Sequence, residues 1–110
     1  MRSIEFEILL TLATEQRHGY AIIQDIERRS GGSLSVETGT LYRALQRLVE
    51  GDLVRPTDAP RAALNDDERR RFYAITPAGR RAAAAEAKRL AILVDAARSA
   101  RLLPPLAEGT

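Results

Sequence analysis

The residues best suited to chemistry are the polar side chains of one stretch, residues 38–53, which reads TGTLYRALQRLVEGDL. Leu41, Leu45 and Leu48 recur at the spacing that lines one side of an α-helix, so the long polar side chains project from the other side. Arginine can pair with guanine and glutamine with adenine, while threonine and tyrosine hydroxyls can bond to phosphate. Such a helix suits the DNA major groove. The residues predicted to contact DNA here are Thr38, Gly39, Thr40, Tyr42, Arg43, Gln46 and Arg47.

Each of these residues has a plainer interpretation beside the DNA-binding one. Arg43 and Gln46 are predicted to read bases and Arg47 to bind phosphate, but a solvated polar side is common on amphipathic helices. Gly39 lacks a side chain, which lets backbone N–H groups approach a phosphate near the positive end of the helix dipole. The alternatives are that Gly39 is a turn residue and Tyr42 a packing group. Periodicity alone does not separate these readings.

Composition limits the functions that this chain of 110 residues can have. The length suits one domain with a modest core and an appended helix. The absence of cysteine excludes disulfides and thiol chemistry, and His18, the one histidine, makes a poor metal site without clustered ligands. We read His18 as a helix-start residue and expect no metal and no other cofactor. Without a phosphate-binding glycine loop or paired carboxylates, an enzyme is not expected.

Charge is unevenly distributed along the chain, whose net charge is +2. Residues 1–52 hold six arginines and eight acidic residues, whereas residues 53–110 hold eleven basic and seven acidic ones. Attraction to DNA would therefore have to come from a local basic surface rather than from bulk charge. No stretch is apolar enough to span a membrane, so we expect a cytoplasmic protein without a membrane partner.

The order of predicted elements is three helices, two strands and one long helix. Glycines end the second helix and, in a left-handed turn at Gly51, the third helix, whose start is capped by Ser35 or Glu37. Two β-prone runs follow, the first stopped by Pro56, with a charged loop between them. Three helices and a hairpin make a winged helix, so the fold class is mainly α with a β-hairpin wing. The expected segments are helices 3–13, 18–30, 38–50 and 77–103, and strands 53–55 and 72–75.

The predicted wing carries a run of arginines that could reach the minor groove or the DNA backbone. Arg70 and Arg71 are the candidates, although the acidic residues 66–68 just before them could simply neutralise their charge. Alternation along the strand places Arg71 and Tyr73 on one face, and Arg70 with Phe72 on the other.

The last helix carries an apolar seam at alternating spacings of four and three, the pattern of a short coiled coil weakened by alanine. Because three helices and the hairpin already cover the core, this seam is predicted to pack on a second copy. The interface residues are Ala83, Ala87, Leu90, Leu93, Val94 and Ala97. We therefore expect a DNA-binding domain at residues 1–76, a dimerisation helix at 77–104 and a frayed tail at 105–110.

These motifs resemble the PadR-type transcriptional regulators, in the branch where a single C-terminal helix dimerises. The matching stretches are HGYAI at residues 18–22, GTLYRAL at 39–45, RL at 47–48, GDLV at 51–54 and RFYAITPAG at 71–79. The resemblance implies a homodimeric winged-helix DNA-binding protein, usually a repressor and often released by a small effector. Glu37 departs from the pattern, because a carboxylate beside Gly39 would repel phosphate.

Two functions fit these residues. The first is a dimeric, sequence-specific regulator of transcription that binds double-stranded DNA. The second is a winged-helix protein–protein interaction module without DNA binding, which the acidic balance of residues 1–52 favours. An effector pocket, in the first case, would lie between the DNA-binding heads and the last helices and would be lined by aliphatic groups.

Overall fold

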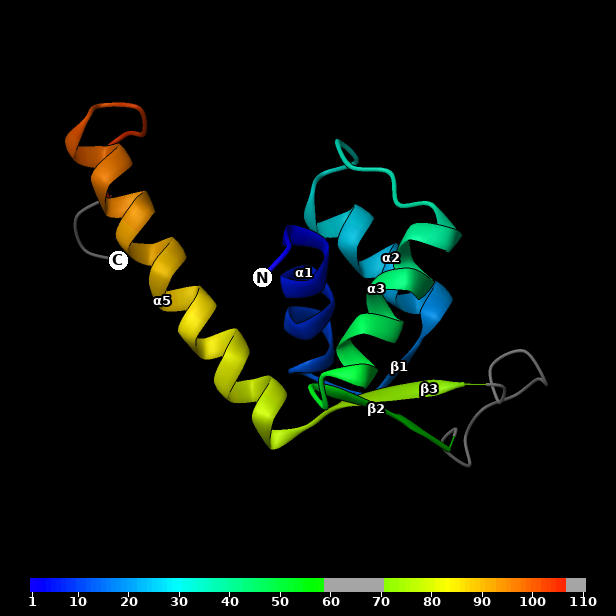
Figure 1. The fold of residues 1–110 in the computed structure, drawn as a ribbon. Helices are drawn as coiled ribbons and strands as arrows, with labels where there is room; N and C mark the ends of the chain where they lie inside the picture. The colour runs from blue at the N-terminus through cyan, green and yellow to red at the C-terminus, as the bar shows by residue number, and fades with distance from the viewer. Residues whose placement is uncertain (59–70, 107–110) are drawn as a thin grey trace.

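The computed structural model describes residues 1–58 and 71–106, which form a helical head and one long projecting helix (Figure 1). The head packs three helices against a small antiparallel sheet at one end, and the last helix leaves from that end. In chain order the elements are α1 (Ser3–Leu12), β1 (Arg17–His18), α2 (Gly19–Arg29), α3 (Thr38–Glu50), β2 (Val54–Thr57), β3 (Phe72–Ile75) and α5 (Pro77–Ser99).

The core lies where α1, α2 and α3 meet, and each helix contributes its apolar positions to it. In α3 the positions predicted from the leucine spacing are the buried ones. On α1, Leu10 is 40% exposed although the helix is apolar on nearly every side, and the helix ends at Leu12 rather than at the predicted Ala13. The fully enclosed core side chains are Ile8, Leu9, Leu12, Ile22, Ile26, Leu41, Leu45 and Val54.

The sheet has three strands in the order β1-β3-β2, one more than the predicted hairpin. The added strand is Arg17–His18, which pairs antiparallel with Tyr73 and Phe72 of β3. The prediction that Pro56 stops the other strand is also wrong, because Pro56 lies within β2 and pairs with Tyr73. Proline is tolerated there because β2 is an edge strand, where one row of backbone groups needs no partner.

Three helices end in the same way, with a residue in the left-handed conformation just after the cap. After α2 this residue is Gly31, with φ +67°, as the glycine pair predicts. After α3 the prediction is wrong: Gly51 has φ −84° and Asp52 takes the left-handed conformation at φ +61°. The N–H groups of Asp52 and Leu53 then satisfy the last carbonyls of α3 by donating to Val49 and Leu48.

The start of α5 is fixed to the head by its N-cap residue, Thr76. The Thr76 hydroxyl accepts the Gly79 N–H at 2.9 Å and donates to the Asp52 carbonyl at 2.7 Å, and Pro77 occupies the first helical position. Gly79 is buried, and a Cβ on it would contact the Leu53 carbonyl oxygen and lie 2.8 Å from Ile75 Cγ1. A glycine is therefore required by packing at this corner.

The far end of α5 differs from the prediction. The helix stops at Ser99, four residues before the predicted Leu103, because Arg101 takes the left-handed conformation at φ +62°. The N–H of Leu102 then donates to the Ala97 carbonyl, so the helix ends before the two prolines. Figure 1 shows α5 leaving the sheet end of the head and diverging from α1 toward its own C-terminus.

Candidate nucleic-acid interface

The outward side of α3 lies open along the length of the helix. Thr38, Gly39, Tyr42, Arg43 and Gln46 are exposed and Thr40 is half-buried, while every leucine of the helix is buried. The division between the two sides is the one that the leucine spacing predicts. Five of the seven α3 residues predicted to contact DNA thus present a largely open surface.

The first turn of α3 is open and lacks a side-chain cap. The N-cap residue is Glu37, and its side chain makes no capping hydrogen bond, so the predicted capping by Ser35 or Glu37 is wrong. A Cβ on Gly39 would meet only the guanidinium of Arg43, at 3.2 Å. Because the first N–H groups of a helix have no partner within it, this turn offers donors on an uncluttered surface.

Arg43 and Gln46 are held by weak local contacts. Arg43 Nη2 donates to Thr40 Oγ1 at 3.4 Å, and Gln46 Nε2 donates to Glu50 Oε1 at 3.2 Å. Both bonds join side chains one helical turn apart whose donors, Arg43 and Gln46, are exposed, so both can be exchanged for bonds to another molecule. Glu50 adds a negative charge to this surface, which offsets the positive charge of Arg43.

Arg47, predicted to bind phosphate, is engaged elsewhere. Its guanidinium is half-buried and donates to Glu5 Oε2 on α1 at 2.7 Å. Partial burial alone would raise the pKa of Glu5, but the bonds from Arg47 and the Arg2 backbone, with both guanidinium charges, bring that pKa below its ordinary value. Arg47 therefore fixes α3 against α1 and stands apart from the open surface.

Tyr42 links α3 to the start of α2. Its ring is 43% exposed and lies over Gly19, where an added Cβ would be 2.7 Å from the ring carbon Cζ and would also clash with the hydroxyl. Tyr42 therefore packs over Gly19 while part of the residue stays open to solvent. Tyr20 in the first turn of α2 is 64% exposed and does not cover the core.

The wing and α3 face each other across one hollow of about 490 Å³. Arg71 lies on its rim, exposed, and shares the lining with Tyr73, as strand alternation predicts. Arg70 lies outside the described residues. Arg55 on β2 is an exposed arginine of the wing that the sequence reasoning missed, although it precedes Pro56 in the predicted strand. The hollow is lined by Tyr42, Leu45, Gln46, Val49, Glu50, Pro56, Arg71 and Tyr73.

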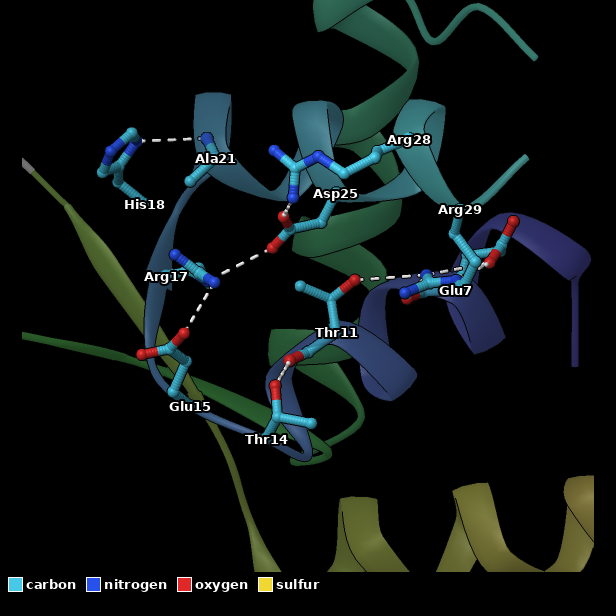
Figure 2. A network of polar contacts seen from close by, with 10 residues as sticks. All are labelled: Glu7, Thr11, Thr14, Glu15, Arg17, His18, Ala21, Asp25, Arg28 and Arg29. Atoms are coloured by element: carbon cyan, nitrogen blue, oxygen red, sulfur yellow. Dashed lines mark hydrogen bonds and ion pairs between the residues drawn. The ribbon is translucent and has the colours of Figure 1, made fainter. Parts of the chain in front are cut away.

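A network of polar contacts holds α2 against α1 and β1 (Figure 2). Arg29 reaches back to α1, where its guanidinium donates to Glu7 Oε1 at 2.9 Å and to Thr11 Oγ1 at 3.2 Å. Arg17 of β1 forms an ion pair with Asp25 at 3.2 Å. His18 caps α2, as predicted, by accepting the Ala21 N–H on Nδ1 at 3.2 Å. These contacts fix the two helices that support α3.

Comparison with known proteins identifies this arrangement. The family model described as the transcriptional regulator PadR-like family matches residues 8–85. The chain belongs to the PadR-like family of transcriptional regulators. Its winged helix is the family fold, with α3 as the outward-facing third helix of the head.

Individual relatives of this PadR-like chain extend the comparison. An uncharacterized 37.1 kDa protein in transposon TN4556 of Streptomyces fradiae is 42% identical over 86 residues, 78% of this chain but only 22% of that protein. A transcriptional regulator structure from Clostridium thermocellum has a TM-score of 0.73 at 21% identity, with 87% of both chains covered. Bacillus subtilis PadR in complex with operator DNA has a TM-score of 0.66 at 16% identity, covering 99% of this chain and 52% of that one.

The seam of α5 divides into a covered and an open part. Ala83 is half-buried and packs against the core of its own head, and its place in a dimer interface remains a prediction. Farther along, Leu90 and Ala97 are half-buried, Ala87 is exposed, Leu93 is 52% exposed and Val94 is 39% exposed.

No described helix is long and apolar enough to cross a membrane.

Proposed function

We propose that this PadR-like chain is a dimeric, sequence-specific DNA-binding transcriptional regulator that acts as a repressor in the cytoplasm. The observation that carries the proposal is the open side of α3, which shares one hollow with the wing and its Arg71. A helix inserted in the major groove would bring Arg43 and Gln46 to the base edges, with Thr38, Gly39, Thr40 and Tyr42 at the phosphates. Bacillus subtilis PadR, which has the same fold, is known in complex with operator DNA, and this supports DNA binding by the present chain.

The open part of the α5 seam supports a dimer. Leu90, Leu93, Val94 and Ala97 present apolar surface on a helix that has left its own head, and Ile92 beside them is 68% exposed. A second copy covering this surface would remove it from water and would place two α3 helices for two half-sites on the DNA. Residues 1–76 are then the DNA-binding part and α5 the dimerisation part.

Retention of genomic DNA fragments by the purified protein tests this proposal. We expect selective retention, and Arg43→Ala should weaken binding to the retained fragment by about 1–3 kcal/mol. Arg28→Ala is the matched control, since Arg28 lies on α2 and bonds to Asp25. An Arg43→Ala protein that folds and binds the fragment as tightly as the wild type would remove Arg43 from the reading surface.

A protein–protein interaction module is the second candidate, because Glu37 and Glu50 place two carboxylates on the open side of α3. Salt dependence separates the two functions. Phosphate contacts release counterions, so a DNA binder loses affinity steeply as salt rises. No binding to random fragments at low salt would favour the interaction module.

A further inference from the structure

The head contains a second hollow of about 490 Å³ on the other side of the α3 start. Its walls come from the first turns of α1, the end of α2, the connection between α2 and α3, and the first turn of α3. This location differs from the effector pocket predicted between the heads and the last helices. The cavity is lined by Ser3, Ile4, Glu7, Ile26, Leu34, Ser35, Val36, Glu37 and Thr40.

The lining combines an aliphatic floor with negative charge. Ile4, Leu34 and Val36 supply accessible apolar surface, the lining holds no aromatic ring, and the volume suits a small organic molecule. The only charged residues of this lining are acidic: Glu7, whose Oε1 is ion-paired with Arg29 outside the lining, and Glu37. A ligand with an apolar body and one positive charge would complement this surface.

Each carboxylate retains an oxygen able to accept a bond from a ligand. Arg29 bonds to Oε1 and the backbone carbonyl of Glu7, and within the described residues no bond reaches Glu7 Oε2. Glu37, at the N-cap, makes no capping hydrogen bond. Both carboxylates can therefore accept N–H groups without breaking the contacts that hold the helices together.

The wall formed by the α2–α3 connection is fixed in place before any ligand binds. The Val36 N–H donates to Glu27 Oε2 on α2 at 2.9 Å, and the Leu34 N–H donates to Ser30 Oγ at 3.0 Å. These two bonds tie the connection to α2 on either side of Ser35. A ligand would thus meet a preformed surface rather than having to order a loop.

We propose that this cavity binds a small aliphatic ammonium ion and that its occupancy strengthens DNA binding. The reasoning for the second part rests on the proposed function. Glu37 precedes Thr38 and Gly39 at the start of α3, where its charge repels DNA phosphate. A bound cation would neutralise that charge, and by linkage DNA would raise the affinity for the cation by the same factor.

Calorimetric titration of the DNA-free protein tests the site by itself. The probes are cyclohexylmethylammonium and its neutral isostere cyclohexylmethanol. We expect the ammonium ion to bind about tenfold more tightly, because a charge-assisted hydrogen bond replaces a neutral one. Equal affinity for both probes, or binding of neither, would overturn the proposal.

Two variants locate the site, each with a matched control. Glu37→Gln should remove most of the preference for the cation, whereas Asp95→Asn on exposed α5 should not. Leu34→Ala should weaken both probes, since Leu34 is 47% exposed in the lining, whereas Leu102→Ala at 78% exposure should weaken neither. Equal effects of the Glu37 and Asp95 variants would mean that the cation binds elsewhere.

Titration of the retained DNA fragment with and without the ammonium probe tests the coupling. A lower Kd for DNA in the presence of the probe, lost in Glu37→Gln, is expected. A higher Kd, or an unchanged one, would overturn the coupling. If the protein fails to bind DNA at all, the proposed function fails while the calorimetric result for the cavity still stands.

Discussion

The starts of α3 and α5 contain similar residues and have opposite surroundings. Both combine a threonine with a glycine, at Thr38-Gly39 and at Thr76–Gly79. At α5 the threonine is 6% exposed and hydrogen-bonded twice, and the glycine touches the Leu53 carbonyl. At α3 both residues are exposed, and the glycine has only the flexible Arg43 beside it.

This difference separates residues that the fold itself requires from residues proposed to contact DNA. Residues at the start of α5 are fixed by the protein's own packing and would be needed in any protein with this corner. In the described part of the chain no side-chain hydrogen bond involves Thr38, and a Cβ on Gly39 would meet only Arg43, so we attribute these two residues to the proposed DNA contact. Substitutions at the two starts should therefore affect different measurements.

Gly79→Ala should have the largest effect on stability. The added Cβ meets backbone at Leu53, which cannot move away as a side-chain tip can, so we expect a loss of about 3 kcal/mol in the free energy of unfolding. Urea denaturation followed by circular dichroism measures this loss. A change below about 0.5 kcal/mol, the range of ordinary surface substitutions, would contradict the packing argument.

Thr76→Val should cost about 2 kcal/mol, because it removes the cap of α5 and leaves the Asp52 carbonyl without its hydroxyl donor. Thr38→Val is the control, since Thr38 is exposed and is not the N-cap of its helix. The same denaturation experiment compares them. Equal losses in the two variants would remove the distinction between the helix starts.

Gly39→Ala should leave the protein folded and raise its stability by about 0.5 kcal/mol, because alanine loses less backbone entropy than glycine in a helix. DNA affinity should fall, since the new methyl group stands on the surface proposed to approach phosphate. Fluorescence anisotropy with the retained fragment measures that affinity. Unchanged binding would make Gly39 an incidental helix residue.

Lowering the pH should remove a smaller contribution to the stability of the folded protein, that of the Glu5–Arg47 ion pair. The pKa of Glu5 is lowered in the folded protein, so its stabilisation is fully present above the ordinary value of 4.5 and is lost as pH falls through the lower folded value. Glu5→Gln should lack this part of the acid dependence. Denaturation midpoints measured from pH 6 down to pH 3 for both proteins check it, and parallel curves would contradict it.

The helical part of the fold follows from local sequence. The leucine spacing of α3 and the Thr76-Pro77 start of α5 each depend on neighbours within a few residues, and the structure confirms both. Features that depend on distant partners could not be predicted. The two-residue strand β1 has no periodicity of its own and exists because β3 lies beside it.

The candidate site shows the same limit. The exposed side of α3 is readable from periodicity, but the assignment of Arg47 is not, since its partner Glu5 lies 42 residues away. The left-handed residues Asp52 and Arg101 were also missed, because sequence preference assigns that conformation to glycine. The contacts of Arg70 and the partner of α5 remain predictions.

Because the corner at Thr76–Gly79 holds one end of α5, a small change at this corner would tilt the whole helix. The helix is 23 residues long. Its first turn is fixed to the head, while apolar side chains toward its C-terminus are exposed to solvent. A helix of this length extends about 35 Å, so a tilt of about 10° at the base would carry the tip through about 6 Å. In the proposed dimer, such a tilt would change the separation of the two heads by a distance that matters against the pitch of DNA. A change in the packing around Gly79 would thereby change the half-site spacing of the operators that the dimer binds.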